Sequence, residues 1–445
     1  MTEPYWDVVI IGAGAAGLSA ARALAEAGRS VLLLESRDRI GGRIWTRHDI
    51  DTPVPIEVGA EFIHGQIPQT FHLLQEVGQE ALDTRGAHWS FLHGQLQQRT
   101  DDDLFDQVQA ALKAANLHTQ PDISFQEFLD RGDRYGLSSE AKELAQRFVQ
   151  GFDAADPARV SAQSIAEEWG SGGMLDEPQF RPRGGYSSVL TALAGKLDRR
   201  NVRVQLQTVV TTVRWKPGTV DIEGLFMGQP FRATAPKAIV TVPIGVLQLP
   251  QDAPGAIRFS PALEKKRTAL AGIVSGAVLK VVLRFRTAFW EELDGGRFRD
   301  TTFFYSLETP FPTFWTTMPL RSPFLTAWSG GPPAARLCEK SDEQIVREAV
   351  RSLEIMFGNH LPRGKAQLEA VFVHNWERDP FARGAYSYVA VGNNDTARRT
   401  LAAPLEDTLF FAGEATDTEG EAATVTGALQ SGIRAAREVS GNSSE

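Results

Sequence analysis

The chain has 445 residues, 42% of them hydrophobic and 23% charged, a balance typical of a globular protein with roughly two or three domains. Its formal charge of -9 disfavours nucleic acid or an anionic membrane as a partner and is compatible with cationic ligands. The single cysteine, Cys338, excludes an intramolecular disulfide and a metal site built on several cysteines, so we expect no metal.

The N-terminal stretch MTEPYWDVVIIG carries neither the basic segment nor the apolar core of a secretory signal. The sequence also lacks a run of about 18 apolar residues that could cross a bilayer. We therefore expect a cytoplasmic protein without a membrane anchor. Its oligomeric state is expected to be a monomer or a homodimer.

The first strong structural signal is the stretch DVVIIGAGAAGLSAARALAEAGRSVLLLE. The apolar run at residues 8–11 is typical of a parallel strand buried on both faces, and the alanine-rich helix after it ends at Gly28. The glycines between them have the spacing GxGxxG, which allows a tight turn, close approach of a pyrophosphate and close packing of helix on strand. An acid closes the second strand, where it can accept from ribose hydroxyls. The predicted dinucleotide contacts are Gly12, Gly14, Ala16, Gly17 and Glu35.

The next residues, SRDRIGGRIWT, favour FAD over NAD as the dinucleotide. Arg37 and Arg43 offer two guanidinium groups, and a glycine pair that includes Gly42 lets the backbone approach closely. This turn can therefore embrace a phosphate or the ribityl chain of a flavin. The alternative is an ordinary basic turn at the surface.

The middle of the chain changes character twice. Residues 69–170 are mostly polar and helical, and Ser138 or Ser139 is a plausible N-cap within them. Two later stretches, 201–215 and 236–247, read as strands of the first domain.

The C-terminal half predicts a second sheet and a return to the first domain. Strands of another sheet are expected in GAVLKVVLRF, LTAWSG and AVFVHNW, with a helix between them that starts with a capping box at Ser341. The last stretch, from residue 407 to 439, reads as a strand, a loop and a helix with small residues on one face.

The predicted fold class is α/β, with a doubly wound, Rossmann-like FAD-binding domain interleaved with a substrate domain of mixed β-sheet and helices. The FAD-binding domain is expected over residues 1–75, 200–262 and 390–445. The substrate domain is expected over residues 76–199 and 263–389, with a helical subdomain at about 100–175.

Several motifs occur in order from one end of the chain to the other: GAGAAG, LLESRDRIGGR, VGAEFIHG, VTVPIGVL, VLKVVLRF, NWERDPFARGAYSYVAVG and LFFAGEAT followed by ATVTGALQSG. Together they resemble the flavin-containing amine oxidase family, which includes monoamine oxidases, polyamine oxidases and flavin histone-lysine demethylases. The FIHG and C-terminal motifs look nearer to polyamine oxidases and demethylases than to monoamine oxidases. The stretch from about 80 to 200 carries little of the resemblance.

The resemblance implies roles for residues around the flavin. Glu414, after Gly413, would hold the ribityl chain or the pyrophosphate, and the backbone of Val210 would hold the adenine. Thr424 and Val425 would begin the last helix beside the isoalloxazine ring. A helix N-terminus suits that place because its unpaired N–H groups stabilise the negative charge of a reduced flavin.

The stretch IEVGAEFIHG would lie against the flavin, with glycines that let the backbone come close. By the same resemblance, Gly59, Ala60, Glu61 and Phe62 are flavin contacts, and His64 looks into the substrate cavity. A histidine that is satisfied within the core is the rival interpretation of His64.

Lys280 interrupts the β-run VLKVV, and lysine is almost never buried without a partner. The pattern alone permits a lysine on a solvated strand face, whereas the resemblance implies that Lys280 reaches, through a water, the flavin nitrogen that accepts the hydride. Trp376 and Tyr386 would form aromatic walls before the flavin and attract a cationic amine. Core packing is the alternative for these rings, and the one expected for Tyr388.

Two positions depart from the monoamine oxidase pattern. Ala385 stands where those enzymes have a cysteine that tethers the flavin, so FAD is expected to be bound non-covalently. Thr424 stands at the position of their second cage aromatic, which leaves room for longer or bulkier amines. Asp156, just before Pro157, could bind a distal cationic amine of the substrate or be only a solvated capping acid.

These features predict an FAD-dependent amine oxidase that acts on a primary or secondary amine, with a polyamine as one candidate. The substrate would lose a hydride to the flavin, the resulting imine would hydrolyse, and O2 would reoxidise the flavin and yield H2O2. The alternatives left open are an L-amino-acid oxidase, which needs an arginine clamp for a carboxylate, a desaturase with a long apolar tunnel, and a flavin-binding protein without turnover.

Overall fold

The computed structural model describes residues 5–98, 102–170, 178–358, 368–393 and 395–441. A five-stranded sheet forms the centre of the first region. Its strands, in spatial order, are β10 (Val202–Gln205), β2 (Val31–Leu34), β1 (Val8–Ile11), β14 (Lys237–Val240) and β23 (Leu409–Phe411). Every pairing is parallel, and segments far apart in the sequence build one sheet, which confirms the predicted Rossmann-like α/β class.

The two faces of this sheet are covered differently because its side chains alternate. Val8 and Ile10 point into a core with four helices, and Val9 and Ile11 point into a core with a second sheet. The helices are α1 (Ala15–Glu26), α2 (Pro68–Glu76), α7 (Ser187–Gly195) and α13 (Val425–Val439). The second sheet consists of β13 (Gln229–Ala235), β12 (Thr219–Phe226), β11 (Thr208–Lys216) and β15 (Arg258–Ser260).

A seven-stranded sheet forms the other large unit. Its strands, in spatial order, are β21 (Leu368–His374), β17 (Val278–Phe285), β20 (Phe324–Gly330), β19 (Thr313–Trp315), β18 (Thr301–Ser306), β7 (Ala87–Leu92) and β8 (Gln95–Gln98). The helices α10 (Gly331–Cys338) and α11 (Asp342–Phe357) pack on it in one aromatic-rich core. Ser341 caps α11 with the predicted capping box.

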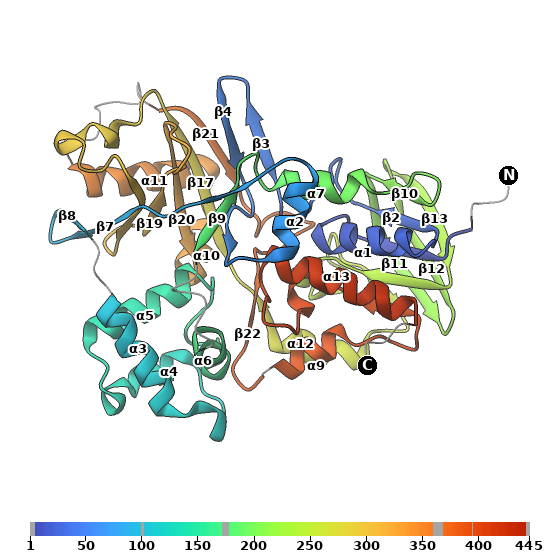
Figure 1. The fold of residues 1–445 in the computed structure, drawn as a ribbon. Helices are drawn as coiled ribbons and strands as arrows, with labels where there is room; N and C mark the ends of the chain where they lie inside the picture. The colour runs from blue at the N-terminus through green and yellow to red at the C-terminus, as the bar shows by residue number, and fades with distance from the viewer. Residues whose placement is uncertain (1–4, 99–101, 171–177, 359–367, 394, 442–445) are drawn as a thin grey trace.

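Four helices form a separate core next to this sheet: α3 (Asp102–Ala115), α4 (Phe125–Asp130), α5 (Ser139–Gly151) and α6 (Ala162–Gly170). Short 3-10 turns at Leu117–Thr119 and Gly132–Tyr135 connect them. Ser138 is the N-cap of α5, as predicted. Figure 1 shows this helical group below the seven-stranded sheet, on the side away from β10 and β13.

Small elements connect these units. The hairpin of β3 (Thr46–Asp49) and β4 (Thr52–Glu57) shares a small core with the seven-stranded sheet, and β5 (Ile63–His64) and β6 (Ala81–Asp83) pair with β9 (Gln179–Pro182). A two-stranded pairing joins β16 (Ile273–Ser275) to β22 (Ser387–Val389). The remaining elements are α8 (Ile244–Leu247), α9 (Glu264–Gly272), α12 (Asp395–Ala402) and 3-10 turns at Phe289–Glu291, Leu293–Gly295 and Glu414–Thr416.

The structure corrects two expectations about secondary structure. The segment 236–247 is strand only through Val240, and after Pro243 it forms the single-turn helix α8. The segment 81–98 lies within a range expected to be helical, but it is extended. Trp89 and Phe91 alternate into the aromatic core, which favours a strand over a helix.

The predicted domain limits remain a prediction, and α7 bears on one of them. This helix lies inside the range assigned to the substrate domain, yet Val189 and Leu193 pack in the same core as α1 and α13.

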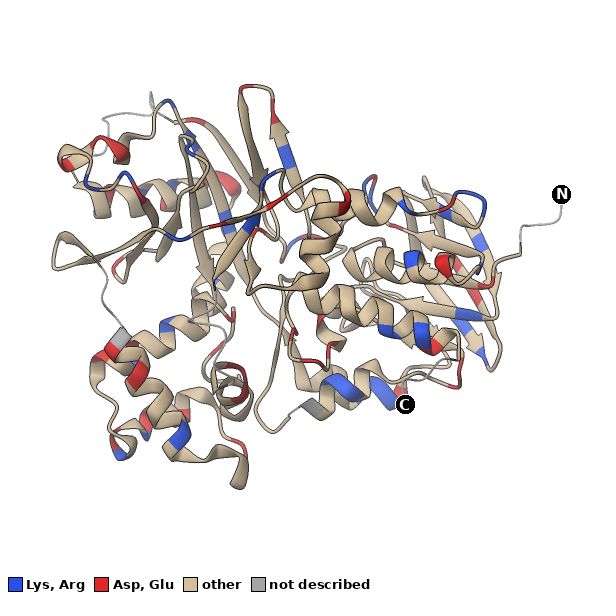
Figure 2. Cartoon of the chain, viewed as in Figure 1, with Lys and Arg blue, Asp and Glu red and all other residues tan. Residues whose placement is uncertain are grey.

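Charged residues of both signs are spread over all parts of the fold in Figure 2. Among the described residues, no helix is long and apolar enough to cross a membrane.

The contact between β1 and α1 generates the first testable prediction. A Cβ added at Gly17 would lie 1.9 Å from the carbonyl oxygen of Gly12, so Gly17→Ala must push α1 away from the turn. Overpacking of this kind costs about 1–3 kcal/mol, and here it also deforms the dinucleotide turn. We expect lower FAD content and a lower melting temperature for this variant.

Gly195→Ala is the matched control, because an added Cβ at Gly195 meets no atom within 4 Å. It should keep native FAD content and melting temperature. If Gly17→Ala behaves like this control, the close approach of α1 to β1 is not what shapes the turn.

Candidate active site

A cavity of about 1800 Å³ runs from the β1–α1 turn to the helical group. It is larger than the roughly 300–1,000 Å³ of an ordinary small-molecule pocket. One end is lined by the turn and by residues after β2, and the other by residues of α5 and α6, while β17 and the start of α13 also line the cavity. This size and shape suit a dinucleotide together with a second small molecule.

The turn at the first end has the features of a phosphate cradle. Gly12 has φ +109°, a conformation that only glycine adopts easily. The N-cap of α1 is Gly14, and no side chain caps this helix, so its first N–H groups stay available to an anion. Gly12, Gly14 and Ala16 line the cavity, whereas Gly17 does not line it and serves packing instead.

The Glu35 carboxyl group is buried at the end of β2 and lines the cavity. Its Oε2 accepts from the Ala13 N–H at 2.8 Å, and its Oε1 accepts from the N–H of Arg37 at 2.9 Å and the hydroxyl of Ser36 at 3.2 Å. A carboxylate has about four acceptor positions. One therefore remains for a ribose hydroxyl, which fits the predicted role.

The two arginines expected at the phosphate are each paired with a carboxylate. Arg37 donates two hydrogen bonds to Asp379, at 2.7 and 2.8 Å. Arg43 donates to Glu414 at 3.0 Å and to the carbonyl oxygen of Ala385. Both arginines line the cavity, as does Gly42, so contact with a cofactor stays a prediction. In the structure, the hydrogen bonds of each guanidinium group link segments of the chain that line the cavity.

The C-terminal motif forms the wall opposite the turn. Gly413, Glu414, Thr424 and Val425 line the cavity, with Val425 as the first residue of α13. The Thr424 hydroxyl accepts from the N–H of Gly427 at 3.0 Å and donates to the Glu421 carbonyl at 2.7 Å. Because these two hydrogen bonds occupy the Thr424 hydroxyl in the helix cap, a substrate could contact Thr424 only through its methyl group.

These residues fit FAD: a glycine turn, an uncapped helix end, an acid with a spare acceptor position and a second helix start line one cavity. Gly59, Ala60, Glu61 and Phe62 line the same cavity. Val210 is the exception. It belongs to β11, its side chain packs in the core shared with β1, and it is absent from the cavity lining, so the adenine contact predicted for its backbone remains a prediction.

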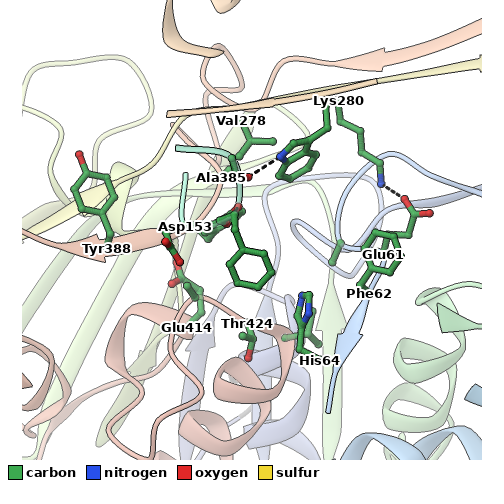
Figure 3. Close-up of a pocket in the computed structure, with 18 of the residues that line it drawn as sticks. Glu61, Phe62, His64, Asp153, Val278, Lys280, Ala385, Tyr388, Glu414 and Thr424 are labelled. Carbon is green, nitrogen blue, oxygen red and sulfur yellow. Dashed lines mark hydrogen bonds and ion pairs between the residues drawn. The ribbon is translucent and has the colours of Figure 1, made fainter. Parts of the chain in front are cut away.

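Lys280 is buried and lines the cavity, so the solvated strand face that the pattern permitted is wrong. Its Nζ donates to Glu61 Oε2 at 2.5 Å and to the Gly59 carbonyl oxygen at 3.1 Å. Figure 3 shows the Lys280 side chain reaching Glu61 beside Phe62. Glu61 therefore turns its carboxylate to the lysine.

Two further residues complete this buried cluster. The indole N–H of Trp315 donates to Glu61 Oε1 at 3.0 Å, and Arg181 Nη1 lies 3.3 Å from the same oxygen. Burial acts to raise the pKa of Glu61, but the charges of Lys280 and Arg181 outweigh it and lower that pKa. Trp315 and Arg181 could not be predicted as part of the site, because their spacing from Glu61 in the sequence carries no signal.

His64 lies in β5, lines the cavity and contacts the ring of Phe152 edge-on, with centroids 5.2 Å apart. Its Nδ1 is buried and has no hydrogen-bond partner among the described residues. Burial lowers the pKa of His64 to about 4, so the ring is neutral at neutral pH. A fully satisfied core histidine, the rival interpretation, is therefore not what the structure shows.

The predicted aromatic walls also line the cavity. Trp376 is held by a 3.2 Å hydrogen bond from its indole N–H to the Val58 carbonyl. The Tyr386 hydroxyl donates to the Phe152 carbonyl at 2.5 Å. Burial, followed by the charges of two nearby acids, raises the pKa of Tyr386, which keeps it neutral. Tyr388 packs in the core of the helical group.

The acid predicted at the cavity mouth needs a correction. Asp156 does not line the cavity, and its Oδ1 accepts from the Ala158 N–H at 3.0 Å, as in a capping turn. Asp153, three residues earlier in the same motif, is buried and does line it. Ala154 between them has φ +51°, a strained conformation that sequence patterns do not reveal.

Asp153 is paired with a second acid, Glu168 of α6, which also lines the cavity. Neither carboxyl oxygen of Asp153 has a hydrogen-bond partner within the described part of the chain. Burial raises the pKa of Asp153 well above its usual range, and the nearby Glu168 raises it further. Burial raises the pKa of Glu168 too. A nearby cation stabilises a buried carboxylate, and no basic side chain of the described residues pairs with Asp153.

The match to known families decides the identity of this cavity. The model of the family described as flavin containing amine oxidoreductase matches residues 15–440. The chain belongs to this family. FAD is its cofactor, and its activity is FAD-dependent oxidation of an amine. This result confirms the predicted FAD-dependent amine oxidation.

Similar proteins come from two branches of the family. The chain is 29% identical to Polyamine oxidase 2 of Arabidopsis thaliana, over 97% of this chain and 87% of that protein. It is 28% identical to Lysine-specific histone demethylase 1 homolog 3 of the same plant, over 96% of this chain but only 29% of the demethylase. It is also 28% identical to human Lysine-specific histone demethylase 2 and spans 53% of that protein.

Solved structures support the same fold. A redesigned putrescine oxidase superimposes with a TM-score of 0.80 at 22% identity, covering 99% of both chains. Wild-type putrescine oxidase bound to putrescine superimposes with a TM-score of 0.77 at 21% identity, covering 98% of this chain and 99% of that one.

His64 gives a prediction about pH. Its pKa in the fold is about 4, below the ordinary value of 6.5, so the unfolded state takes up a proton first as the pH falls. This residue therefore destabilises the enzyme progressively between about pH 6.5 and pH 4. We expect His64→Gln to gain thermal stability relative to the native enzyme across this window and to show a constant difference above it.

The measurement is the melting temperature of both holoenzymes from pH 4.5 to pH 8. His48→Gln, at an exposed side chain of β3, is the control and should follow the native curve. A difference for His64→Gln that does not depend on pH would mean that burial leaves the pKa of His64 unchanged and would contradict the prediction.

Proposed function

We propose that this enzyme oxidises an amine that carries a second cationic group several bonds from the reacting carbon, as in a diamine or polyamine. The observation that carries this proposal is the unpartnered, buried Asp153 carboxyl beside Glu168. An ammonium group bound there would give the Asp153 carboxyl a counter-charge, because no basic side chain of the described residues pairs with it. The names of the polyamine and putrescine oxidases support the same substrate class.

The protein side of the mechanism follows from the cavity. Bound FAD supplies the acceptor for the hydride that leaves the carbon next to the amine nitrogen. We propose that Trp376 and Tyr386 hold the reacting amine between aromatic faces. Lys280 has three N–H donors, of which Glu61 and Gly59 use two, so one remains to face the cavity.

Two further features of the cavity would stabilise negative charge near the flavin and exclude water from the site. The N-terminus of α13 lies at the cavity and favours negative charge near it. His64, Phe152 and Trp328 line the part between the flavin side and the acids, and they present mostly apolar surface there. We propose that O2 is the electron acceptor and that H2O2 leaves, as the sequence suggested.

Asp153→Asn tests the substrate. The amide keeps the shape of the side chain but cannot carry the charge that a distal ammonium needs. We expect KM for linear diamines to rise roughly tenfold to a hundredfold, while kcat and turnover of monoamines stay nearly unchanged, the sign of lost uniform binding. Asp156→Asn is the matched control and should match the native enzyme, because Asp156 does not line the cavity.

The readouts are steady-state oxidation rates, which give KM and kcat, and anaerobic bleaching of the flavin by diamines, polyamines, monoamines and amino acids. Bleaching by diamines that Asp153→Asn weakens and Asp156→Asn leaves unchanged supports the proposal. Equal effects of Asp153→Asn on monoamines and diamines would contradict a distal subsite, and bleaching by amino acids alone would restore the amino-acid oxidase.

We also predict that FAD is bound non-covalently. Ala385 lines the cavity and cannot form a thioether, and Cys338 is buried away from the cavity in the core of the seven-stranded sheet. Acid or heat denaturation should therefore release all FAD into the supernatant, as measured by absorbance at the flavin bands. Colour retained by the precipitated chain would show a covalent bond to another residue.

A further inference from the structure

The resemblance implied that Glu61 contacts the flavin directly. Its buried carboxylate instead contacts other side chains of the protein, which indicates a different role. Its two oxygens face three donors from three different strands: Lys280 of β17, Trp315 of β19 and Arg181 of β9. A carboxylate with that many charged and polar partners is fixed in position.

The same contacts fix Lys280. A lysine side chain has several rotatable bonds, and its ammonium group could otherwise adopt many positions in a cavity of this size. Here the 2.5 Å contact with Glu61 and the 3.1 Å contact with the Gly59 carbonyl hold two of its three N–H groups. The remaining N–H is available to a ligand in the cavity that Lys280 lines.

We propose that Glu61 is a positioning residue, which holds the Lys280 ammonium group against the flavin side of the cavity through a buried ion pair. Glu61 thus acts on the flavin through Lys280. This inference rests on the proposed place of Lys280 beside the flavin, so the experiment has to separate the two ideas.

A double-mutant cycle does so with Glu61→Gln, Lys280→Met and the double variant, each as FAD-loaded enzyme. The glutamine can still accept from Trp315, but it carries no charge to hold the ammonium. The two readouts are the rate constant of anaerobic flavin reduction and the visible absorption spectrum of bound FAD, which does not depend on turnover.

We expect Glu61→Gln to slow reduction on the order of tenfold and to shift the flavin spectrum when Lys280 is present. In the Lys280→Met background, the same change should alter the rate by less than about twofold and leave the spectrum unchanged. Such non-additivity is the sign of a residue that acts through its partner.

Other outcomes overturn the inference in distinct ways. Equal spectral shifts in both backgrounds would make Glu61 a direct flavin contact, and no change in either would leave it a purely structural ion pair. If Lys280→Met itself changes neither rate nor spectrum, the proposed role of Lys280 fails, whatever Glu61 does.

Two variants guard against a misfolded Glu61→Gln protein. Glu61→Asp keeps the charge but retracts it by one methylene group, so it should show a smaller effect in the same direction and again only with Lys280 present. Glu57→Gln is the matched control. Glu57 is a buried carboxyl nearby that bonds to Thr46 and Tyr186 instead of Lys280, and its variant should retain the native spectrum.

Discussion

The structure depends on ion pairs between charged side chains that the fold buries. Glu61, Lys280 and Arg181 come from a loop and two different sheets, and each would be costly to bury alone, by several kcal/mol. Because they meet, the loop of the IEVGAEFIHG motif is fixed against β17, and one wall of the cavity is fixed with it. Glu414 and Arg43 do the same for the opposite wall.

The other end of the cavity follows the opposite rule. Asp153 is also buried, but no basic side chain of the described residues pairs with it, and burial raises its pKa and that of the neighbouring Glu168. Paired charges thus hold the walls beside Glu61 and Glu414, and the Asp153 carboxyl is where we propose that the distal ammonium group of the substrate binds. A diamine bound in this way would react through its neutral nitrogen, while its other nitrogen would remain cationic beside Asp153.

Local rules allowed much of the fold to be predicted from the sequence. The GxGxxG turn, the capping box at Ser341 and the β-runs depend on neighbouring residues, so the first sheet and Lys280 could be recognised. The partners of Glu61 could not, because Arg181 and Trp315 meet it only through the packing of separate sheets. Asp156 was predicted from the resemblance to an acid that precedes a proline, and Asp153, which lines the cavity, was missed because its burial leaves no pattern in the sequence.

The most direct test is a crystal structure of the FAD-loaded enzyme with a linear diamine, after anaerobic reduction of the flavin to stop turnover. The account predicts the pyrophosphate at the start of α1, the flavin ring in the part of the cavity lined by Lys280 and the start of α13, and one substrate nitrogen hydrogen-bonded to Asp153 or Glu168. A diamine whose distal nitrogen lies in solvent or contacts neither acid would contradict the account.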